Sequence, residues 1–320
     1  MFASIYRKSQ PAKYGSLTLR NGRSMPLVGL GTWQSSPEEV VSAVETAIDV
    51  GYRLIDTAAF YANEKSIGEA INNKINAGVI KRQDIFVTTK LHIQYLHRDD
   101  VRPALERSLA ALGLDYVDLY LIHCSMGLQK SEKTMFPMND NNEPLLDETI
   151  DHLETWEGME GVYDLGLTKA IGLSNFNSQQ IMRIYDSARI KPMNLQVECH
   201  AHFRQERLHE LCSSLGITFT AYAPLGSPNR PGFIVSKLNG SDIYPLTDPV
   251  IARIAEDHEK TSAQVCLRYL MQRGIAVIPK SVTPSRIQEN FDLDFELNDD
   301  EMDVINNLPR NERSFFFEVL

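Results

Sequence analysis

Apolar residues recur along the chain in two alternating patterns, short continuous runs and longer segments with helical spacing. The continuous runs, such as residues 117–123, are rich in Val, Leu, Ile and Tyr and have the length of buried strands. The longer segments place apolar residues three or four apart. Residues 37–50 are an example, with a proline in the first turn and Gly51 directly after the last. Both features are typical of helix ends.

The two patterns predict eight strands that alternate with helices. The predicted strands cover residues 27–32, 53–56, 85–90, 117–123, 170–174, 194–198, 217–223 and 276–278. The predicted helices cover residues 37–50, 66–75, 99–111, 147–165, 178–188, 206–215, 249–259 and 262–273. Alternation favours a parallel sheet, and eight units favour closure into a (β/α)8 TIM barrel over an open, doubly wound sheet. The predicted fold class is therefore α/β.

A hairpin precedes the first of these strands. Residues 17–27 form two short strand patterns around Asn21-Gly22, which is a strong signal for a tight turn. The first 23 residues carry five basic residues and no acid, which is one mark of a transit peptide. Because this stretch runs into a strand pattern, we interpret residues 1–14 as a poorly ordered N-terminal extension instead.

Two connections are much longer than the others, at residues 124–144 and 226–248. Each follows a predicted strand, so both should lie at the C-terminal face of the barrel, where active sites are found. Long loops inside a compact domain usually act as lids or binding loops. We find no linker and predict one domain over residues 1–320.

The composition is ordinary for a globular protein with a large core, with 43% hydrophobic and 23% charged residues. The net charge of −10 argues against nucleic acid or an anionic membrane as the main partner. No apolar run approaches the roughly 18 to 20 residues of a membrane span. The four cysteines lack metal-ligand spacing and need no disulfides. We expect a cytoplasmic monomer without a metal site.

Three titratable residues close predicted strands: Asp56, Lys90 and His123. A charge at the end of an apolar strand is costly unless it has a partner or faces a site. Tyr61 follows the first of these strands, and a nearby lysine stabilises phenolate and eases the transfer of its proton. The set predicts a proton donor. The alternative is a buried Asp56–Lys90 ion pair beside a core histidine.

The remaining strand ends are also polar. They contribute Ser174, Asn175, Gln196, Tyr222 and Lys280. The opposite strand ends read as ordinary turns. This asymmetry indicates that one face of the barrel carries the site.

Five segments carry a resemblance to a known family. They are Gly-Leu-Gly-Thr-Trp at 29–33, Gly-Tyr-Arg-Leu-Ile-Asp-Thr-Ala at 51–58, Asp-Tyr-Val-Asp-Leu-Tyr-Leu-Ile-His at 115–123, Lys-Ala-Ile-Gly-Leu-Ser-Asn-Phe at 169–176 and Ile-Pro-Lys-Ser-Val-Thr-Pro at 278–284. In this order and spacing the chain resembles an aldo-keto reductase of the aldose and aldehyde reductase branch, from about residue 17 to about residue 311. The resemblance implies that Tyr61 is the general acid, that Lys90 and Asp56 tune it, and that His123 orients a carbonyl group.

The expected cofactor is NADPH/NADP+, although the dinucleotide motif G-x-G-x-x-G is absent. Lys280, Ser281 and Arg286 follow the last strand and suit the 2′-phosphate of NADPH. The alternative for Arg286 is a solvated helix residue. The resemblance further implies adenine contacts from Glu289 and Asn290, carboxamide contacts from Asn175 and Gln196, stacking by Tyr222, and a further cofactor contact from Ser174. Further cofactor contacts are expected at Thr32, Trp33, Leu225 and Ser227.

The chain departs from the family pattern around the cofactor and the substrate. Gln34 and Asn229 stand where relatives often have a lysine and an aspartate that clasp the cofactor. We therefore expect a hydrogen-bonded or looser clasp, with faster cofactor release or weaker affinity. His92 and Cys124 stand where tryptophans are common. Cys124 is either an oxidisable thiol or a small apolar wall. The expected substrate pocket comprises Trp33, Phe60, His92, His123, Cys124 and Phe136. The phenylalanines at 315–317 either cap this pocket or pack on the barrel.

The sequence thus predicts NADPH-dependent reduction of a small-molecule aldehyde or ketone, with Tyr61 as proton donor. The alternative from another class is an NADPH-binding regulatory or scaffold barrel with little activity. A third possibility is the same chemistry in reverse, as an alcohol dehydrogenase.

Overall fold

The computed structural model describes residues 12–141, 143–228 and 244–315. Within them, eight strands run parallel in the order β10-β9-β8-β7-β6-β5-β4-β3. They are β3 (Leu30–Gly31), β4 (Leu54–Asp56), β5 (Phe86–Leu91), β6 (Leu119–Ile122), β7 (Ile171–Ser174), β8 (Asn194–Glu198), β9 (Thr218–Tyr222) and β10 (Ile275–Val277). Parallel bridges from Val28 to Val277 and from Gly31 to Lys280 close the sheet on itself. The predicted barrel is confirmed.

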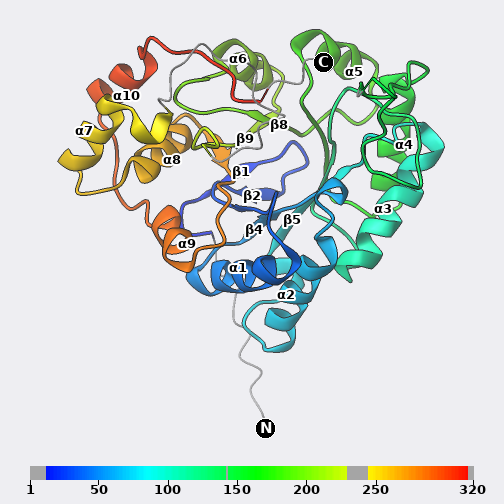
Figure 1. The fold of residues 1–320 in the computed structure, drawn as a ribbon, viewed down its shortest axis with the longest axis horizontal. Coiled ribbons are helices and arrows are strands. Elements are labelled where there is room, and N and C mark those ends of the chain that lie inside the picture. The colour runs from blue at the N-terminus through cyan, green and yellow to red at the C-terminus, as the bar shows by residue number, and fades with distance from the viewer. Residues whose placement is uncertain (1–11, 142, 229–243, 316–320) are drawn as a thin grey trace.

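Helices surround the barrel, as Figure 1 shows. They are α1 (Pro37–Val50), α2 (Glu64–Asn76), α3 (Arg98–Leu112), α4 (His152–Asp164), α5 (Ser178–Ser187), α6 (Glu206–Ser214), α7 (Pro249–Asp257), α8 (Ser262–Gln272), α9 (Pro284–Phe291) and α10 (Asp299–Asn306). The predicted start at residue 147 was wrong for α4, because Asp151 caps this helix through the Leu153 amide. Helices α9 and α10 were absent from the predicted helices.

Local signals explain why helix α1 has its predicted bounds. Ser36 accepts a hydrogen bond from the Glu39 amide, and the Glu39 carboxylate accepts one from the Ser36 amide. This capping box satisfies two amides at the start of the helix. Gly51 ends the helix with a φ of 119°, a left-handed conformation that costs glycine little.

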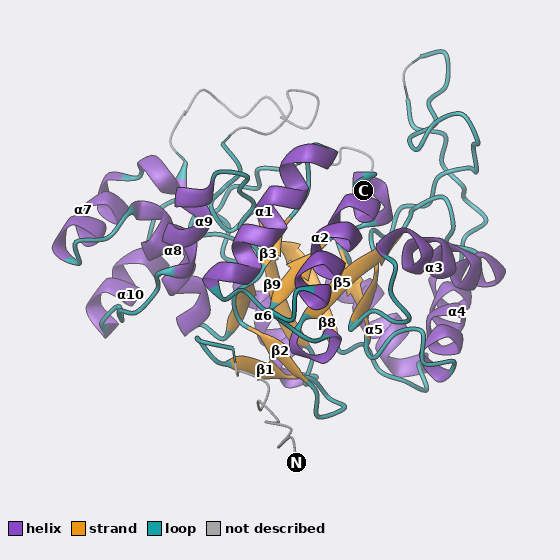
Figure 2. Ribbon diagram, turned by 90° about the horizontal axis from the view of Figure 1, so that it is seen from below, coloured by secondary structure: helices purple, strands orange, loops and turns teal. Residues whose placement is uncertain are grey.

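The N-terminal end of the barrel is closed by the predicted hairpin, which pairs β1 (Ser16–Thr18) with β2 (Ser24–Pro26) antiparallel. Leu19 and Met25 from this hairpin pack against inward-facing apolar side chains, including Phe86 of β5 and Leu121 of β6. Figure 2 shows the hairpin beneath the strands. Apolar packing therefore fills this end of the barrel.

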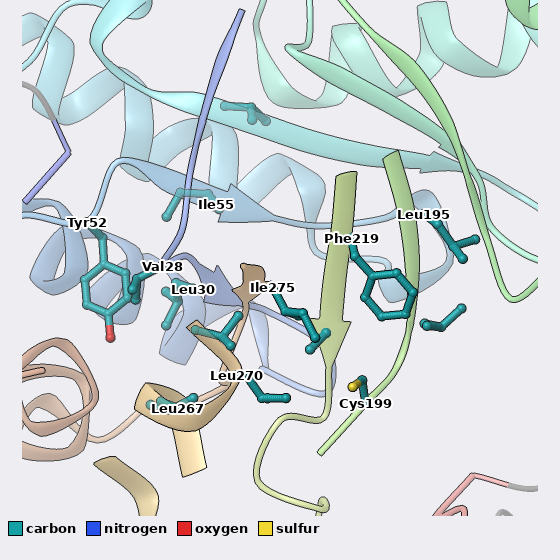
Figure 3. Close-up of a cluster of buried hydrophobic side chains, with 14 of the residues drawn as sticks. Val28, Leu30, Tyr52, Ile55, Leu195, Cys199, Phe219, Leu267, Leu270 and Ile275 are labelled. Carbon is teal, nitrogen blue, oxygen red and sulfur yellow. The ribbon is translucent and has the colours of Figure 1, made fainter. Parts of the chain in front are cut away.

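A second apolar core lies between the outer face of the sheet and the helices. It includes Ile55, Leu195 and Phe219 from the strands and Leu267 and Leu270 from α8 (Figure 3). Residues 85–91 illustrate the alternation: Phe86 belongs to the inner cluster and Val87 to the outer one. This period of two fixes which side chains of β5 point into the barrel.

The chain before the hairpin reaches back to the barrel. Residues 1–11 of the predicted extension lie outside the described residues. Lys13 pairs with Asp294 at 2.6 Å, and the Tyr14 hydroxyl donates to the Phe291 carbonyl oxygen at 2.5 Å. Tyr14, which the sequence assigned to a poorly ordered extension, therefore packs on the barrel.

The two long connections lie after β6 and β9, as predicted. Antiparallel bridges link Leu128 to Leu146 and Met138 to Pro144, so the first connection doubles back and projects from the body (Figure 2). Residues 229–243 of the second lie outside the described residues. All four cysteines are free, buried thiols. Among the described residues no helix is long and apolar enough to cross a membrane, and no group of three His, Cys, Asp or Glu side chains has metal-site geometry.

Candidate active site

Lys90 lies at the centre of a hydrogen-bonded group at the C-terminal end of the barrel. Its ammonium group donates to Asp56 Oδ1 at 2.6 Å and to the Tyr61 hydroxyl at 3.1 Å. A third bond goes to the Thr57 carbonyl oxygen at 2.9 Å. The other carboxylate oxygen of Asp56 accepts from Gln196 Nε2 at 2.7 Å. Three of the four predicted catalytic side chains are thus in direct contact.

The polypeptide brings Tyr61 to Lys90 through a short turn after β4. Residues Ala59–Tyr61 form a 3-10 turn, and Ala62 follows with a left-handed φ of 55°. Such a conformation costs a non-glycine residue about 1 kcal/mol or more and often occurs at functional sites. The turn therefore places the phenol beside a strand end that is 29 residues further along the chain.

Burial controls the protonation states of this group. It raises the pKa of Tyr61, a change that the Lys90 cation opposes and the Asp56 carboxylate supports. Burial disfavours the Lys90 ammonium, but Asp56 and Tyr61 outweigh it and leave the pKa of Lys90 raised. The lysine is thus an ammonium and the tyrosine a phenol at neutral pH. Lys90 does lower the pKa of Tyr61, as the sequence predicted, but the increase that burial causes is larger.

His123 lies against the same tyrosine, with the two ring centroids 5.7 Å apart and the rings at 76°. Burial lowers the pKa of His123 well below its usual range, and the charge of Lys90 and the neighbouring His92 act in the same direction. His123 is therefore a neutral imidazole. At neutral pH it can donate or accept a hydrogen bond but holds no extra proton to transfer.

Amide and hydroxyl groups from the next strands form a second polar group. Asn175 Nδ2 donates to the His123 carbonyl oxygen at 3.0 Å and to Ser174 Oγ at 3.2 Å, and Asn175 Oδ1 accepts from the Tyr222 hydroxyl at 3.0 Å. Asn175 has a left-handed φ of 57°. Ser174 and Gln196 are direct partners between β7 and β8. Three strands thus bring the predicted carboxamide-binding residues together.

The predicted substrate wall is aromatic and centred on Phe60. Its ring centroid lies 5.5 Å from His92, 6.1 Å from His123 and 6.5 Å from Phe136. Cys124 packs beside Phe136 in a small apolar cluster. Burial raises the pKa of the Cys124 thiol to about 11, so it stays protonated at neutral pH. This favours the apolar wall over the reactive thiol.

A different set of aromatic rings lies on the other side of the barrel mouth, by which we mean the open C-terminal end of the barrel. The ring of Phe315 lies 5.7 Å from Trp33 and 5.6 Å from Tyr222. Phe315 is buried, with 5% of its surface exposed. The first phenylalanine of the tail therefore packs at the mouth of the barrel, whereas residues 316–320 lie outside the described residues.

The basic cluster follows β10, beside β3. Lys280 and Arg286 are exposed, whereas Ser281 is buried, and its hydroxyl accepts from the Thr283 amide at 3.1 Å. Thr283 is the N-cap of helix α9 but forms no side-chain cap, which leaves the first amides of this helix without that partner. Cationic side chains at a helix N-terminus suit a phosphate group.

Comparison with known proteins agrees with this arrangement. The model of the Aldo/keto reductase family matches residues 27–309. The chain belongs to the aldo/keto reductase family. Members of this family are oxidoreductases that act on carbonyl groups. The predicted family and fold are both confirmed.

Several relatives cover nearly the whole reductase. Aldo-keto reductase family 1 member A1-A of Danio rerio is 46% identical over 300 residues, which are 93% of this chain and 90% of the relative. Prostaglandin F synthase 2 of Bos taurus is 42% identical and covers 97% and 95% of the two chains. The solved structure of an aldose reductase from Schistosoma japonicum has a TM-score of 0.87, with 46% identity and 94% of each chain covered.

The other cofactor residues predicted for this reductase lie around the same face. Thr32 Oγ1 donates to the Asp56 carbonyl oxygen at 2.8 Å. Leu225 and Ser227 follow β9 and are partly exposed. On helix α9, Glu289 accepts from Thr261 Oγ1 at 3.0 Å and Asn290 is buried. The adenine contacts expected of these last two residues remain predictions.

Of the two residues expected at a cofactor clasp, only Gln34 lies among the described residues. Gln34 has a left-handed φ of 59°, and its carbonyl oxygen accepts from Lys280 Nζ at 3.3 Å. Asn229 lies outside the described residues. The contact links the start of the site at β3 to the basic cluster after β10.

Two polar groups at this end of the barrel were missing from the site residues that the sequence predicted. One is the Thr57 carbonyl oxygen, a backbone atom that no residue-type pattern indicates. The other is Glu198, the last residue of β8, which is buried with 2% of its surface exposed. It carried the same signal as Asp56, an acid at the end of an apolar strand, and that signal was sufficient to find it.

Proposed function

We propose that this aldo/keto reductase catalyses NADPH-dependent reduction of an aldehyde or ketone to an alcohol, with Tyr61 as the proton donor. The hydrogen bond from Lys90 to the Tyr61 hydroxyl carries the proposal. A positively charged donor to the phenol oxygen stabilises the phenolate that forms when the proton leaves.

The bonds of Lys90 also decide which way the tyrosine proton points. An ammonium group has three N–H bonds, and those of Lys90 go to Asp56, Thr57 and Tyr61. Because the phenol oxygen accepts from Lys90, its own O–H is directed elsewhere. We assign that O–H to the oxygen of the substrate carbonyl.

Each remaining part of the machinery has one task. When bound, NADPH supplies the hydride that the carbonyl carbon accepts. Tyr61 gives its proton to the carbonyl oxygen, which yields an alcohol and a phenolate paired with Lys90, and the phenolate is reprotonated from water. Neutral His123 orients the carbonyl by a hydrogen bond. Asp56, held by Gln196, keeps Lys90 charged and in place.

The residues present fit the cofactor. Ser174, Asn175 and Gln196 offer hydroxyl and amide groups for a carboxamide, and Tyr222 offers a ring beside them. Lys280, Arg286 and Ser281 at the start of α9 suit a 2′-phosphate, since arginine binds phosphate in a bidentate manner. Thr32, Trp33, Leu225, Ser227, Glu289 and Asn290 complete the proposed contacts.

The test is oxidation of NADPH, followed by absorbance, with a panel of sugars, short aldehydes, lipid aldehydes, steroids and quinones. We expect turnover with at least one carbonyl and a preference for NADPH over NADH. A strong preference for NADH would contradict the role of Lys280 and Arg286. Tight binding of NADPH without turnover of any carbonyl would favour a regulatory or scaffold barrel instead.

We further propose that the reductase is one domain and acts as a monomer in the cytoplasm. Four free, buried thiols are consistent with a reducing compartment. Size-exclusion chromatography with light scattering tests the oligomeric state: a mass near 36.2 kDa is expected, and a mass near twice that value would contradict it.

A further inference from the structure

The chain after helix α10 is fastened to the barrel by the loop that follows β8. Arg204 of this loop donates to the carbonyl oxygens of Leu308 and Arg310 at 3.1 and 2.9 Å. The Glu312 amide donates to the His202 carbonyl oxygen at 2.6 Å. In Figure 1 this segment runs from α10 past α6. The tail thus follows the rim of the barrel toward the mouth.

Glu198 makes the last and deepest of these attachments. The amide of Ser314 donates to its Oε1 and the amide of Phe315 donates to its Oε2 at 3.1 Å. His200 Nε2 lies 3.0 Å from the same Oε1 and 3.4 Å from Ser314 Oγ. Ser314 Oγ donates to the Gly226 carbonyl oxygen at 3.2 Å. We call Glu198, His200 and Ser314 the tail latch.

The latch is a buried, charge-assisted contact. The exposed fraction is 2% for Glu198, 1% for His200 and 7% for Ser314. A carboxylate with both oxygens bonded to backbone amides binds more strongly than neutral acceptors do. The contact spans 116 residues of sequence, so no local structure requires it.

The latch fixes the position of Phe315, a side chain that lies at the mouth of the barrel. Phe315, whose amide it holds, packs against Trp33 and Tyr222. Trp33 is a proposed substrate wall, and Tyr222 also bonds to Asn175. The one carboxylate of Glu198 therefore determines where an aromatic wall of the site stands.

We propose that Glu198 is a positioning residue that sets substrate specificity by holding Phe315 at the mouth. Carbonyl compounds with an aromatic or long alkyl group reach this wall and bind more tightly through contact with it, whereas short aldehydes do not reach it. The catalytic consequence rests on the proposed function, but the position of the tail does not.

Fluorescence tests the position of the tail without any turnover. The chain has two tryptophans, and Trp156 is buried in the core with 2% exposed, so acrylamide quenching reports mainly on the partly exposed Trp33. Glu198→Gln replaces one acceptor oxygen by an NH2 group that faces a backbone amide. We expect stronger quenching in this variant, because Phe315 leaves Trp33. Unchanged quenching in a folded Glu198→Gln protein would overturn the proposal.

Kinetics test the effect on specificity. In Glu198→Gln we expect KM for a large aromatic aldehyde to rise about tenfold, the order of one lost charge-assisted hydrogen bond, with KM for a short aldehyde and kcat nearly unchanged. Phe315→Leu keeps the latch and should give a similar shift. The double variant should show no further rise, because Glu198 acts through Phe315. Additive effects would contradict the mechanism.

The matched control is Glu210→Gln, which neutralises an exposed glutamate of helix α6. It should leave quenching and both KM values unchanged. If Glu198→Gln fails to fold, Phe315→Leu still tests the proposal. An unchanged ratio of KM values for large and short aldehydes in this variant would refute the role of Phe315 as a substrate wall. If the wild-type protein turns over no carbonyl, the proposed function fails, while the quenching experiment still tests the latch.

Discussion

The two ends of strand β5 show how one barrel separates stability from chemistry. Phe86 and Lys90 both point into the barrel, four residues apart. Phe86 is buried among apolar side chains next to the hairpin, and Lys90 is also buried but bonded to Asp56, Thr57 and Tyr61. The same alternation that fills one end with hydrocarbon thus places a charged group at the other.

Backbone strain is distributed in the same way. Among the described residues, those other than glycine with left-handed φ include Gln34, Ala62, Asn175, Ala223 and Ser227, which all follow strand ends at the mouth. Gln205 and Glu259 are the others. Such conformations cost about 1 to 3 kcal/mol each and persist only where other contacts hold them. Apolar packing at the opposite end of the barrel supplies folding free energy that can offset this cost.

Lys90→Met should have the largest effect and should affect both properties. Removing one partner leaves the Asp56 carboxylate buried and unpaired, which costs about 3–5 kcal/mol of unfolding free energy. Turnover should also fall by at least about 100-fold, since the phenolate loses its cation. Urea unfolding and NADPH oxidation measure the two effects. A variant of normal stability and activity would contradict the assignment of the site.

Phe86→Ala is the matched change at the other end of the same strand. The loss of a buried aromatic side chain should cost about 3–5 kcal/mol of unfolding free energy. At a temperature where the variant is folded, kcat should stay within about twofold of the wild type because the mouth is untouched. A fall in kcat comparable to that of Lys90→Met would show that the two ends are coupled.

His92→Phe should change how stability depends on pH. Burial, with the charge of Arg107, lowers the pKa of His92 to about 4, below its usual 6.5. A lowered folded-state pKa gives stability that is complete above pH 6.5 and declines as the pH falls toward 4. Between pH 6.5 and pH 4, the unfolding free energy of the variant should therefore fall by up to about 3 kcal/mol less than that of the wild type. His123 acts in the same direction, so part of the decline should remain. Identical slopes in both proteins would count against a neutral, buried His92.

The smallest effect is expected at the cofactor clasp. Gln34→Lys combined with Asn229→Asp restores an ion pair that relatives often have, and exposed pairs contribute less than about 1 kcal/mol. We expect NADP+ release to slow by a few fold in stopped-flow fluorescence, with no change in unfolding free energy. Release at the wild-type rate would refute the looser clasp.

The sequence predicted most reliably what depends on neighbouring residues. Helix α1 has its predicted bounds because Ser36, Pro37 and Gly51 are local end signals. Helix α4 starts later than predicted because Asp147 joins the long loop, where its amide donates to the Gly127 carbonyl oxygen at 2.9 Å. Its apolar spacing alone did not reveal this.

The site was predictable to the extent that strand ends converge in a barrel. This placed Asp56 and Lys90 together, and the turn after β4 added Tyr61. The same strand-end signal could have marked Glu198, but not its role in the latch, because its partners are backbone amides more than 100 residues away. Only the folded path of the tail brings Phe315 to Trp33.

The central claim is that the polar end of the barrel donates a proton from Tyr61. Tyr61→Phe removes one hydroxyl and keeps the ring, and NADPH oxidation with an aromatic aldehyde measures the result beside NADPH binding. We predict a fall in kcat of about 100- to 10,000-fold with NADPH affinity unchanged. The unfolding free energy should fall by only about 1 to 3 kcal/mol, because one N–H of Lys90 loses its acceptor. A variant that keeps the kcat of the wild type would contradict the account.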